Sequence, residues 1–330
     1  MKKIRLAGLL LLAPLTLLSA CSGGTPLSFT ANWYRNTALG GSVNDTLEEL
    51  TYEVSFTPAE NDSSFSVEYD TGSYTTRLIN ANIALSDGST KEGYIYTTEL
   101  TISGRYRLGS EVSEDFSDRV SSSVSFLPVT DGLKPVKSEK EVLSTSPIVS
   151  LPETLEGAIE TYHYTYDVSY DAALTTATAV YTDLNAETPA PETREYAIDG
   201  TTTYLDNEQI LFALRGLSLS SVATFRTVNS VMGIVTEVST GTSTTGPTSL
   251  KESVDFTMDG TAVKTEIDAV QVPIIYQSTP SGQQQDLVYA ATTDTNNNTY
   301  RNVLLRMEVP VLQSLGTLVY RLKEATFTTK

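Results

Sequence analysis

Cys21 is the one cysteine in this chain of 330 residues, and the residues before it indicate that its thiol is chemically modified. Three basic residues among the first five precede an apolar run over residues 7–18, and the small residues Ser19 and Ala20 come directly before the cysteine. A positive start, an apolar run too short to span a bilayer and a small-residue end are the three parts of a secretory signal peptide. We therefore predict a signal peptide over residues 1–20, followed by a nucleophilic thiolate.

The four residues Leu18-Ser19-Ala20-Cys21 resemble the lipobox of bacterial lipoproteins, in which the cysteine accepts a diacylglyceryl group. The resemblance implies that Cys21 is the lipid attachment site. It also implies that acyl chains such as palmitate anchor the mature protein in the cell envelope, on the extracytoplasmic side of a bacterial membrane. Two or three chains would hold it firmly, because each buried methylene contributes about 0.8 kcal/mol and one chain is marginal. The alternatives are an ordinary signal peptide and an uncleaved anchor.

Residues 21–46 form the expected lipidated tether. The stretch Ser22–Pro26 is a flexible spacer by composition, and its few residues reach less than roughly 20 Å. Apolar and polar residues then alternate over 27–33, which could be a docking strand. We expect residues 47–330 to be a single β-rich domain. A division into two domains near 144–156, where prolines interrupt the pattern, is the alternative.

The charge of the chain excludes one large class of partners. The sequence has 22 basic and 40 acidic residues, a net charge of −18, and three of the basic residues lie in the predicted signal peptide. The mature chain therefore has 19 basic residues against 40 acidic ones, a net charge of −21. So acidic a surface repels phosphate backbones, and we expect no nucleic acid partner. The lipid anchor is the membrane contact that the sequence predicts.

The residues that usually carry catalysis are scarce. His163 is the one histidine, and Cys21 is already assigned, which leaves no Cys–His pair and no Cys/His metal site. No nucleophile elbow, phosphate-binding glycine loop or dinucleotide motif is present. The stretch Asp294–Asn298 imitates a calcium loop, but Thr299 and Leu305 replace its glycine and its glutamate. A glycosidase-like carboxylate pair stays open, but we expect no enzyme, no catalytic residue, no metal and no cofactor.

The elements that must carry any site are strands. Apolar residues alternate with polar ones along most of the chain, as over Leu50–Phe56 and most clearly over Tyr162–Tyr170. Alternation with a period of two is typical of antiparallel strands that have one buried face. The pair Asp259-Gly260 between two such runs predicts a tight hairpin. We predict a mainly β fold built on a large incurved antiparallel sheet, a half-barrel.

One segment breaks the alternation. Asp206 has the side chain of a helix N-cap, Gln209 stands three residues later as its capping-box partner, and Gly216 follows at the position after the last turn. The apolar residues between them cover more than one side, which favours burial over a surface position. We predict one short helix at about residues 207–215, packed on the concave side of the sheet.

Several short segments resemble an uncharacterised family of bacterial envelope proteins. They are Leu47–Val54, Gly132–Pro135, Asp206–Gly216, Val303–Glu308 and Gly316–Leu318. That family is thought to share an incurved antiparallel sheet with the lipoprotein carriers of the LolA and LolB type. The resemblance implies a half-barrel with an apolar concave side, and it implies no catalytic residue.

A row of tyrosines is the candidate ligand-binding surface. Tyr162, Tyr164, Tyr166 and Tyr170 share one face of their strand, and tyrosine can line a site that is both apolar and hydrogen-bonding. They could equally be core residues in cross-strand pairs. We expect a binding module for an amphiphile, such as a lipid, or for a lipoprotein component. The alternatives are an interaction protein with a filled core and an envelope protein as partner, or a surface carbohydrate-binding protein.

Overall fold

A computed structural model provides the structure of the protein. It describes residues 27–30, 42–60, 64–149, 152–200, 202–229, 233–242, 244–277, 284–293 and 299–328. The predicted signal peptide, Cys21, most of the tether and the stretch Asp294–Asn298 lie outside the described residues.

The described chain is mainly β, as predicted, and its seventeen strands join in one sheet. The strands are β1 (Thr46–Pro58), β2 (Phe65–Tyr69), β3 (Gly72–Ala84), β4 (Thr90–Leu108), β5 (Glu111–Val112), β6 (Phe116–Phe126), β7 (Pro135–Pro147), β8 (Ile159–Tyr170), β9 (Thr176–Asp183), β10 (Pro191–Ala197), β11 (Thr224–Asn229), β12 (Ile234–Ser239), β13 (Thr248–Met258), β14 (Thr261–Tyr276), β15 (Gln285–Ala290), β16 (Leu304–Pro310) and β17 (Gly316–Phe327).

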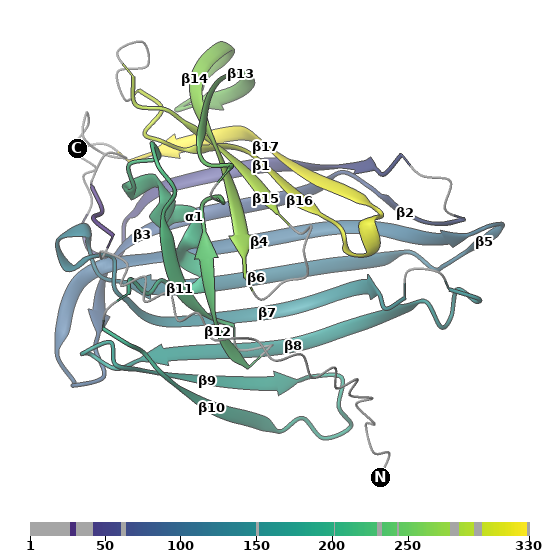
Figure 1. The fold of residues 1–330 in the computed structure, drawn as a ribbon, viewed down its shortest axis with the longest axis horizontal. Helices are drawn as coiled ribbons and strands as arrows, with labels where there is room; N and C mark the ends of the chain where they lie inside the picture. The colour runs from purple at the N-terminus through teal and green to yellow at the C-terminus, as the bar shows by residue number, and fades with distance from the viewer. Residues whose placement is uncertain are drawn as a thin grey trace.

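Antiparallel neighbours follow one another across the sheet in the order β10-β9-β8-β7-β6-β4-β3-β1-β17-β16-β15-β14-β13. Nearly all of these pairs are consecutive in sequence, as in a meander, and Figure 1 shows the long strands side by side. The exceptions are the pair of β4 with β6 and the two pairs of β1, which lies between β3 and β17 and so joins the two ends of the chain inside the sheet. The middle of the sheet therefore depends on the most distant contacts in the sequence.

The sheet is incurved and carries the core on its concave side, as predicted. Along β1 the buried residues Leu50, Tyr52 and Val54 alternate with more exposed ones, and they join the large core cluster. The strand β12 pairs with the end of β14 and forms a hairpin with β11. This hairpin packs across β8 and β9, where Val228 contacts the cluster around Tyr170. Figure 1 shows this hairpin in front of the long strands. The concave side is thus partly closed by the sheet itself.

The stretch 144–156 begins in the last residues of β7 and ends before β8, two neighbouring strands of this sheet. The strands β7 and β8 pair along their whole length, from Lys137 opposite Ser169 to Pro147 opposite Ile159. Between the two strands, Leu155 and Ala158 are buried in a small core cluster at that end of the sheet. The prolines therefore mark the connection between paired strands within the sheet.

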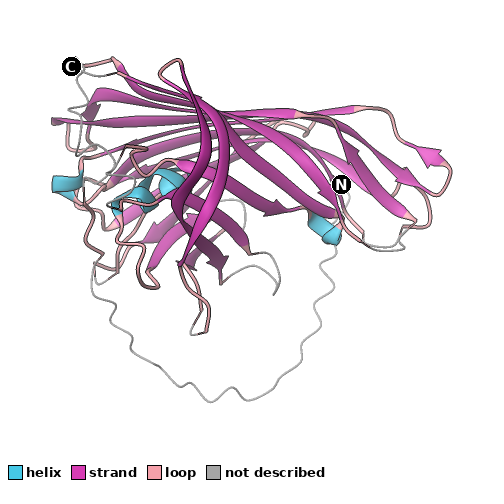
Figure 2. Cartoon of the chain, turned by 90° about the horizontal axis from the view of Figure 1, so that it is seen from above, coloured by secondary structure: helices cyan, strands magenta, loops and turns pink. Residues whose placement is uncertain are grey.

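The helical segment is short and irregular. It consists of a 3₁₀ turn η3 (Asn207–Gln209), one α-helical turn α1 (Ile210–Ala213) and a second 3₁₀ turn η4 (Leu214–Gly216). The predicted capping box is present, and Figure 2 shows these turns against the inner side of the curved sheet. Two further 3₁₀ turns are η2 (Val129–Asp131) and η5 (Leu312–Ser314). No helix among the described residues is long and apolar enough to cross a membrane.

Gly216 has a different role from the one predicted. It belongs to the last 3₁₀ turn and is not among the glycines with positive φ, so it is not the left-handed residue that ends a helix. A Cβ atom there would meet the carbonyl oxygen of Thr30 at 3.2 Å and the ring of Phe29 at 3.4 Å. The glycine therefore allows the N-terminal segment to approach the helix closely.

Candidate functional site

The first residues of the helical segment lie within a buried polar network. The carboxylate of Asp206 accepts hydrogen bonds from the hydroxyls of Ser138 and Tyr170, at 2.6 and 2.8 Å, and from the backbone N–H of Glu208. The backbone N–H of Asp206 donates to the side chain of Gln209 at 3.1 Å, which completes the capping box. The strands β7 and β8 thus fix the point where the helix begins.

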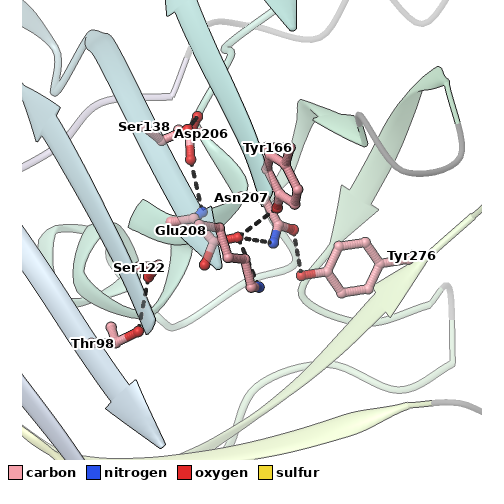
Figure 3. Close-up of polar contacts among 9 residues, drawn as sticks. Thr98, Ser122, Ser138, Tyr166, Asp206, Asn207, Glu208 and Tyr276 are labelled. Carbon is pink, nitrogen blue, oxygen red and sulfur yellow. Dashed lines mark hydrogen bonds and ion pairs between the residues drawn. The ribbon is translucent and has the colours of Figure 1, made fainter. Parts of the chain in front are cut away.

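Glu208 is the centre of this network (Figure 3). Its Oε1 atom accepts from the Lys140 ammonium at 3.0 Å, from the Tyr166 hydroxyl at 2.8 Å and from the Asn207 amide at 2.9 Å. On the opposite wall, the Tyr276 hydroxyl donates to Asn207 Oδ1 at 3.2 Å. The two walls of the half-barrel, β7 with β8 and β14, therefore meet through the first turn of the helix.

The pKa values of the titratable groups in this network are shifted in different directions. Burial, together with the nearby Glu208 carboxylate, raises the pKa of Asp206 to about 6. Burial also opposes the charge of Glu208, but Lys140 and the surrounding hydrogen bonds hold the pKa of Glu208 below its ordinary value. Burial disfavours the charge of Lys140 as well, and the attraction of Glu208 nevertheless raises the pKa of Lys140. The Lys140–Glu208 pair is therefore ionised at neutral pH.

A cavity of about 200 Å³ lies beside this pair. For scale, an engineered apolar cavity of roughly 150 Å³ holds a benzene molecule. Leu100, Val120 and Val309 line it and are only half-buried, so solvent reaches it. The complete lining is Tyr74, Thr98, Leu100, Val120, Lys140, Asn207, Glu208, Ile210, Leu211, Ile274, Tyr276, Gln285, Leu287, Met307 and Val309.

The strand register gives the sheet wall of the cavity a polar row. Thr98 pairs with both Thr76 and Ser122, and Lys140 pairs with both Ser122 and Tyr166, so these five residues run across β3, β4, β6, β7 and β8. The Thr98 and Ser122 hydroxyls lie 2.8 Å apart. A dashed line marks this hydrogen bond in Figure 3. The hydroxyl groups of this row therefore lie in line across the sheet, and the ammonium of Lys140 follows them.

An apolar row lies two residues further along the same strands. Leu100 pairs with both Tyr74 and Val120, and Val142 pairs with both Val120 and Tyr164. Side chains two residues apart on a strand share one face, so both rows belong to the concave side. The cavity spans the two rows, because Thr98 and Lys140 line it together with Leu100 and Val120. Its wall is amphipathic.

The four predicted tyrosines share the concave face of β8 but differ in their surroundings. Tyr166 and Tyr170 are buried and donate hydrogen bonds to Glu208 and Asp206. Tyr164 is half-buried and packs on Tyr166, whereas Tyr162 is 37% exposed at the far end of the strand. The structure brings none of the four into the lining of the cavity, and their role in ligand binding stays a prediction.

The residues that do line the polar part of the cavity were missed by sequence reasoning. Asn207 and Glu208 lie in the predicted helix, but no binding role was predicted for them. Lys140 carried a usable signal, because it lies in phase with Ser138 and Val142 on β7 and so had to face the concave side. Tyr276 had no such signal, since its contact with Asn207 depends on how β14 crosses the helix.

The other end of the helical segment is held by a second buried ion pair. The Arg215 guanidinium donates to both carboxylate oxygens of Glu48, at 2.6 and 2.8 Å, and also to the backbone carbonyl of Arg301 at 2.8 Å. It lies 5.6 Å from the ring centroid of Phe212. This pair joins the helix to β1, in the middle of the sheet.

The tether residues Leu27–Thr30 dock beside the helical segment. The Thr30 N–H donates to the Gly216 carbonyl at 2.6 Å, and the Leu27 N–H donates to the Thr203 hydroxyl at 2.8 Å. Leu27 and Phe29 pack against the main core cluster. These residues form no strand, so the segment docks through single hydrogen bonds and apolar contacts.

The one histidine of the sequence lies away from this network. His163 lies on the outer face of β8, where its Nε2 atom is 3.0 Å from the Glu141 carboxylate. No group of three or more potential metal ligands occurs within the described ranges. The cavity beside Lys140 and Glu208 is therefore the candidate functional site.

No protein-family model matches the sequence, and no curated protein matches it. Among solved structures, the chain is similar to the crystal structure of a beta-barrel-like protein of the domain of unknown function DUF1849 from Brucella abortus. That match has a TM-score of 0.48 and 9% sequence identity, over 86% of this chain and 99% of the other. At this identity, no residue of the site takes a role from that protein.

Proposed function

We propose that this protein is a non-enzymatic binding module of the bacterial cell envelope, anchored through a lipid on Cys21, and that it binds an amphiphile on its concave side. The anchor rests on the lipobox resemblance. The binding rests on the amphipathic wall of the cavity, where the polar row with Thr98 and Lys140 runs beside the apolar row with Leu100 and Val120. A polar head and an acyl chain would each find a matching surface there.

Binding can be tested with the chain from Ser22 onward, which keeps every described residue. It would be purified without detergent, checked for β structure by circular dichroism, and titrated with the neutral apolar fluorophore N-phenyl-1-naphthylamine. We expect saturable fluorescence that an eight-carbon amphiphile displaces. The variant Val120→Trp would fill the cavity and weaken binding by about tenfold or more, because the indole takes the place of the ligand.

The matched control is Val112→Trp, because Val112 is 44% exposed on β5 and does not line the cavity. It should bind like the unchanged chain. Equal binding by the two variants, or no binding by the unchanged chain, would contradict the proposal. The anchor is tested separately in the full chain, by metabolic labelling with an alkyne fatty acid. Cys21→Ala should abolish the label and Ser22→Ala should retain it.

A second candidate function is an interaction protein without a small ligand. The helical segment favours it, because Phe212 and Leu214 are completely buried and polar contacts hold the segment at both ends. Such a protein would have its concave side filled by its own chain. Crosslinking in intact membranes should then recover an envelope protein, and the fluorophore titration should show no saturable site.

A further inference from the structure

The hydrogen bonds of Glu208 are distributed unevenly between its two oxygens. Oε1 accepts from Lys140, Tyr166 and Asn207, whereas Oε2 accepts no hydrogen bond from any described residue. The side chain is only 7% exposed, and Glu208 lines the cavity. A carboxylate can accept about four hydrogen bonds on its two oxygens, and the three that Glu208 accepts are all on Oε1, so Oε2 remains an acceptor at a site where water is restricted.

Lys140 has the complementary capacity. An ammonium has three N–H donors, and one of them is used on Glu208 Oε1 at 3.0 Å. The side chain is 20% exposed, and Lys140 also lines the cavity. The polar part of the cavity therefore offers a free acceptor and free donors side by side.

Charge restricts which head groups fit this arrangement. A carboxylate or sulfate head would receive hydrogen bonds from Lys140 but would also face the carboxylate of Glu208, which repels a like charge. A quaternary ammonium has no N–H for Glu208 and would face Lys140. A hydroxyl group meets both requirements, because it donates through O–H and accepts through its lone pairs.

We infer that the cavity takes a single-chain amphiphile with an uncharged, hydroxyl-bearing head, of the monoacylglycerol class. The inference rests on the proposed function and adds the ligand class to it. One hydroxyl donates to Glu208 Oε2 and accepts from Lys140. The acyl chain lies along the apolar row, beside Leu100 and Val120. The small volume of about 200 Å³ suits one chain and excludes a second.

The test compares two ligands with the same eight-carbon chain, 1-monooctanoylglycerol and octanoate, by displacement of N-phenyl-1-naphthylamine at pH 8. With the chain from Ser22 onward we expect the monoacylglycerol to bind about tenfold or more tightly than octanoate, because octanoate is ionised at this pH and is repelled by Glu208. Glu208→Gln should bring the two affinities within about threefold of each other, since it removes that repulsion.

Glu266→Gln is the matched control, because Glu266 is exposed on β14 and its loss changes the net charge by the same amount. It should leave the preference unchanged. Equal affinities for both ligands in the unchanged chain, or an unchanged preference in Glu208→Gln, would overturn the inference and leave the proposed function standing. If neither ligand displaces the fluorophore, both are wrong. Thermal unfolding of each variant shows whether the fold is intact.

Discussion

A buried ion pair holds each end of the helical segment. We call an end closed when both carboxylate oxygens of its pair accept hydrogen bonds, and open when one oxygen accepts none from the described residues. At the C-terminal end, Arg215 and Glu48 are 3% and 1% exposed, and both carboxylate oxygens are bound. At the N-terminal end, Lys140 and Glu208 are 20% and 7% exposed, and one carboxylate oxygen accepts no bond from the described residues. The two pairs have similar chemistry and differ in what remains unsatisfied.

The difference distinguishes a pair whose carboxylate is fully bound from a pair that keeps an acceptor at the proposed binding site. Both oxygens of the Glu48 carboxylate accept hydrogen bonds from Arg215, so this pair serves to hold the helix on β1. In a pair with free donors and a free acceptor, the hydrogen bonds offset only part of the free energy that desolvation of the two charges costs. A ligand can reach such a pair only where it borders a cavity, and the Lys140–Glu208 pair does so.

Breaking the closed pair should have the largest effect. Arg215→Met leaves the Glu48 carboxylate buried without its partner, and we expect a loss of about 3–5 kcal/mol in the free energy of unfolding. Chemical denaturation followed by tryptophan fluorescence or circular dichroism measures it. Lys264→Met is the control, because Lys264 and Asp255 are 80% and 68% exposed, and it should leave the free energy of unfolding almost unchanged. Equal costs would remove the distinction between the two kinds of pair.

Asp206→Asn should change how stability depends on pH at the open end. The folded-state pKa of Asp206 is raised to about 6 from an ordinary 3.8, so folding favours its protonated form. Its contribution is fully present below about pH 4 and is lost as the pH rises through about 6, by up to about 3 kcal/mol. Asparagine has no such titration and is also a good N-cap.

The measurement is the difference in unfolding free energy between the unchanged chain and Asp206→Asn, from pH 3.5 to pH 7. Other titrating carboxylates, such as Asp118, whose pKa burial also raises to about 6, are present in both proteins and cancel. The difference should fall as the pH rises and then level off. A constant difference would mean that folding does not raise the pKa of Asp206. Its carboxylate would then be more hydrated than the structure indicates.

The smallest effect is expected from the tyrosines of β8. Tyr166→Phe removes one of three hydrogen bonds to Glu208 Oε1 and should cost about 1.5 kcal/mol, because the bond goes to a charged group. Tyr162→Phe is the matched control, since Tyr162 lies on the same face but is 37% exposed, and it should cost almost nothing. Thermal or chemical unfolding separates them. Equal values would show that Tyr166 does not help to hold the open end.

Local features of the fold were predictable because neighbouring residues encode them. The capping box of Asp206 and Gln209 is confirmed, and Asp259-Gly260 forms the predicted tight turn, with φ of 47° and 77° at its two residues. Positive φ at both central residues is the geometry of a type I′ turn. The role of Gly216 was wrong because it depends on a close approach by Thr30, which no local pattern records.

The candidate site was less predictable than the fold. The tyrosines stood out by type and spacing, but the cavity is lined instead by Lys140, Glu208 and Tyr276 with their apolar neighbours. Each of these residues comes from a different part of the sequence. A single polar residue is common in a strand where polar and apolar residues alternate, so none of them stands out. Only Lys140 could have been found, from its position in the inward phase of β7.

The sequence by itself determined the mainly β architecture, the inward face of each strand and the helical interruption, because period-two alternation and capping act between near neighbours. It also determined the acidic net charge and the candidate lipid attachment at Cys21. Only the tertiary structure decided which residues stand beside one another across the strands. Register depends on turn lengths, on bulges and on the pairing of β1 with β17, and these together bring Thr98, Lys140 and Glu208 to one cavity.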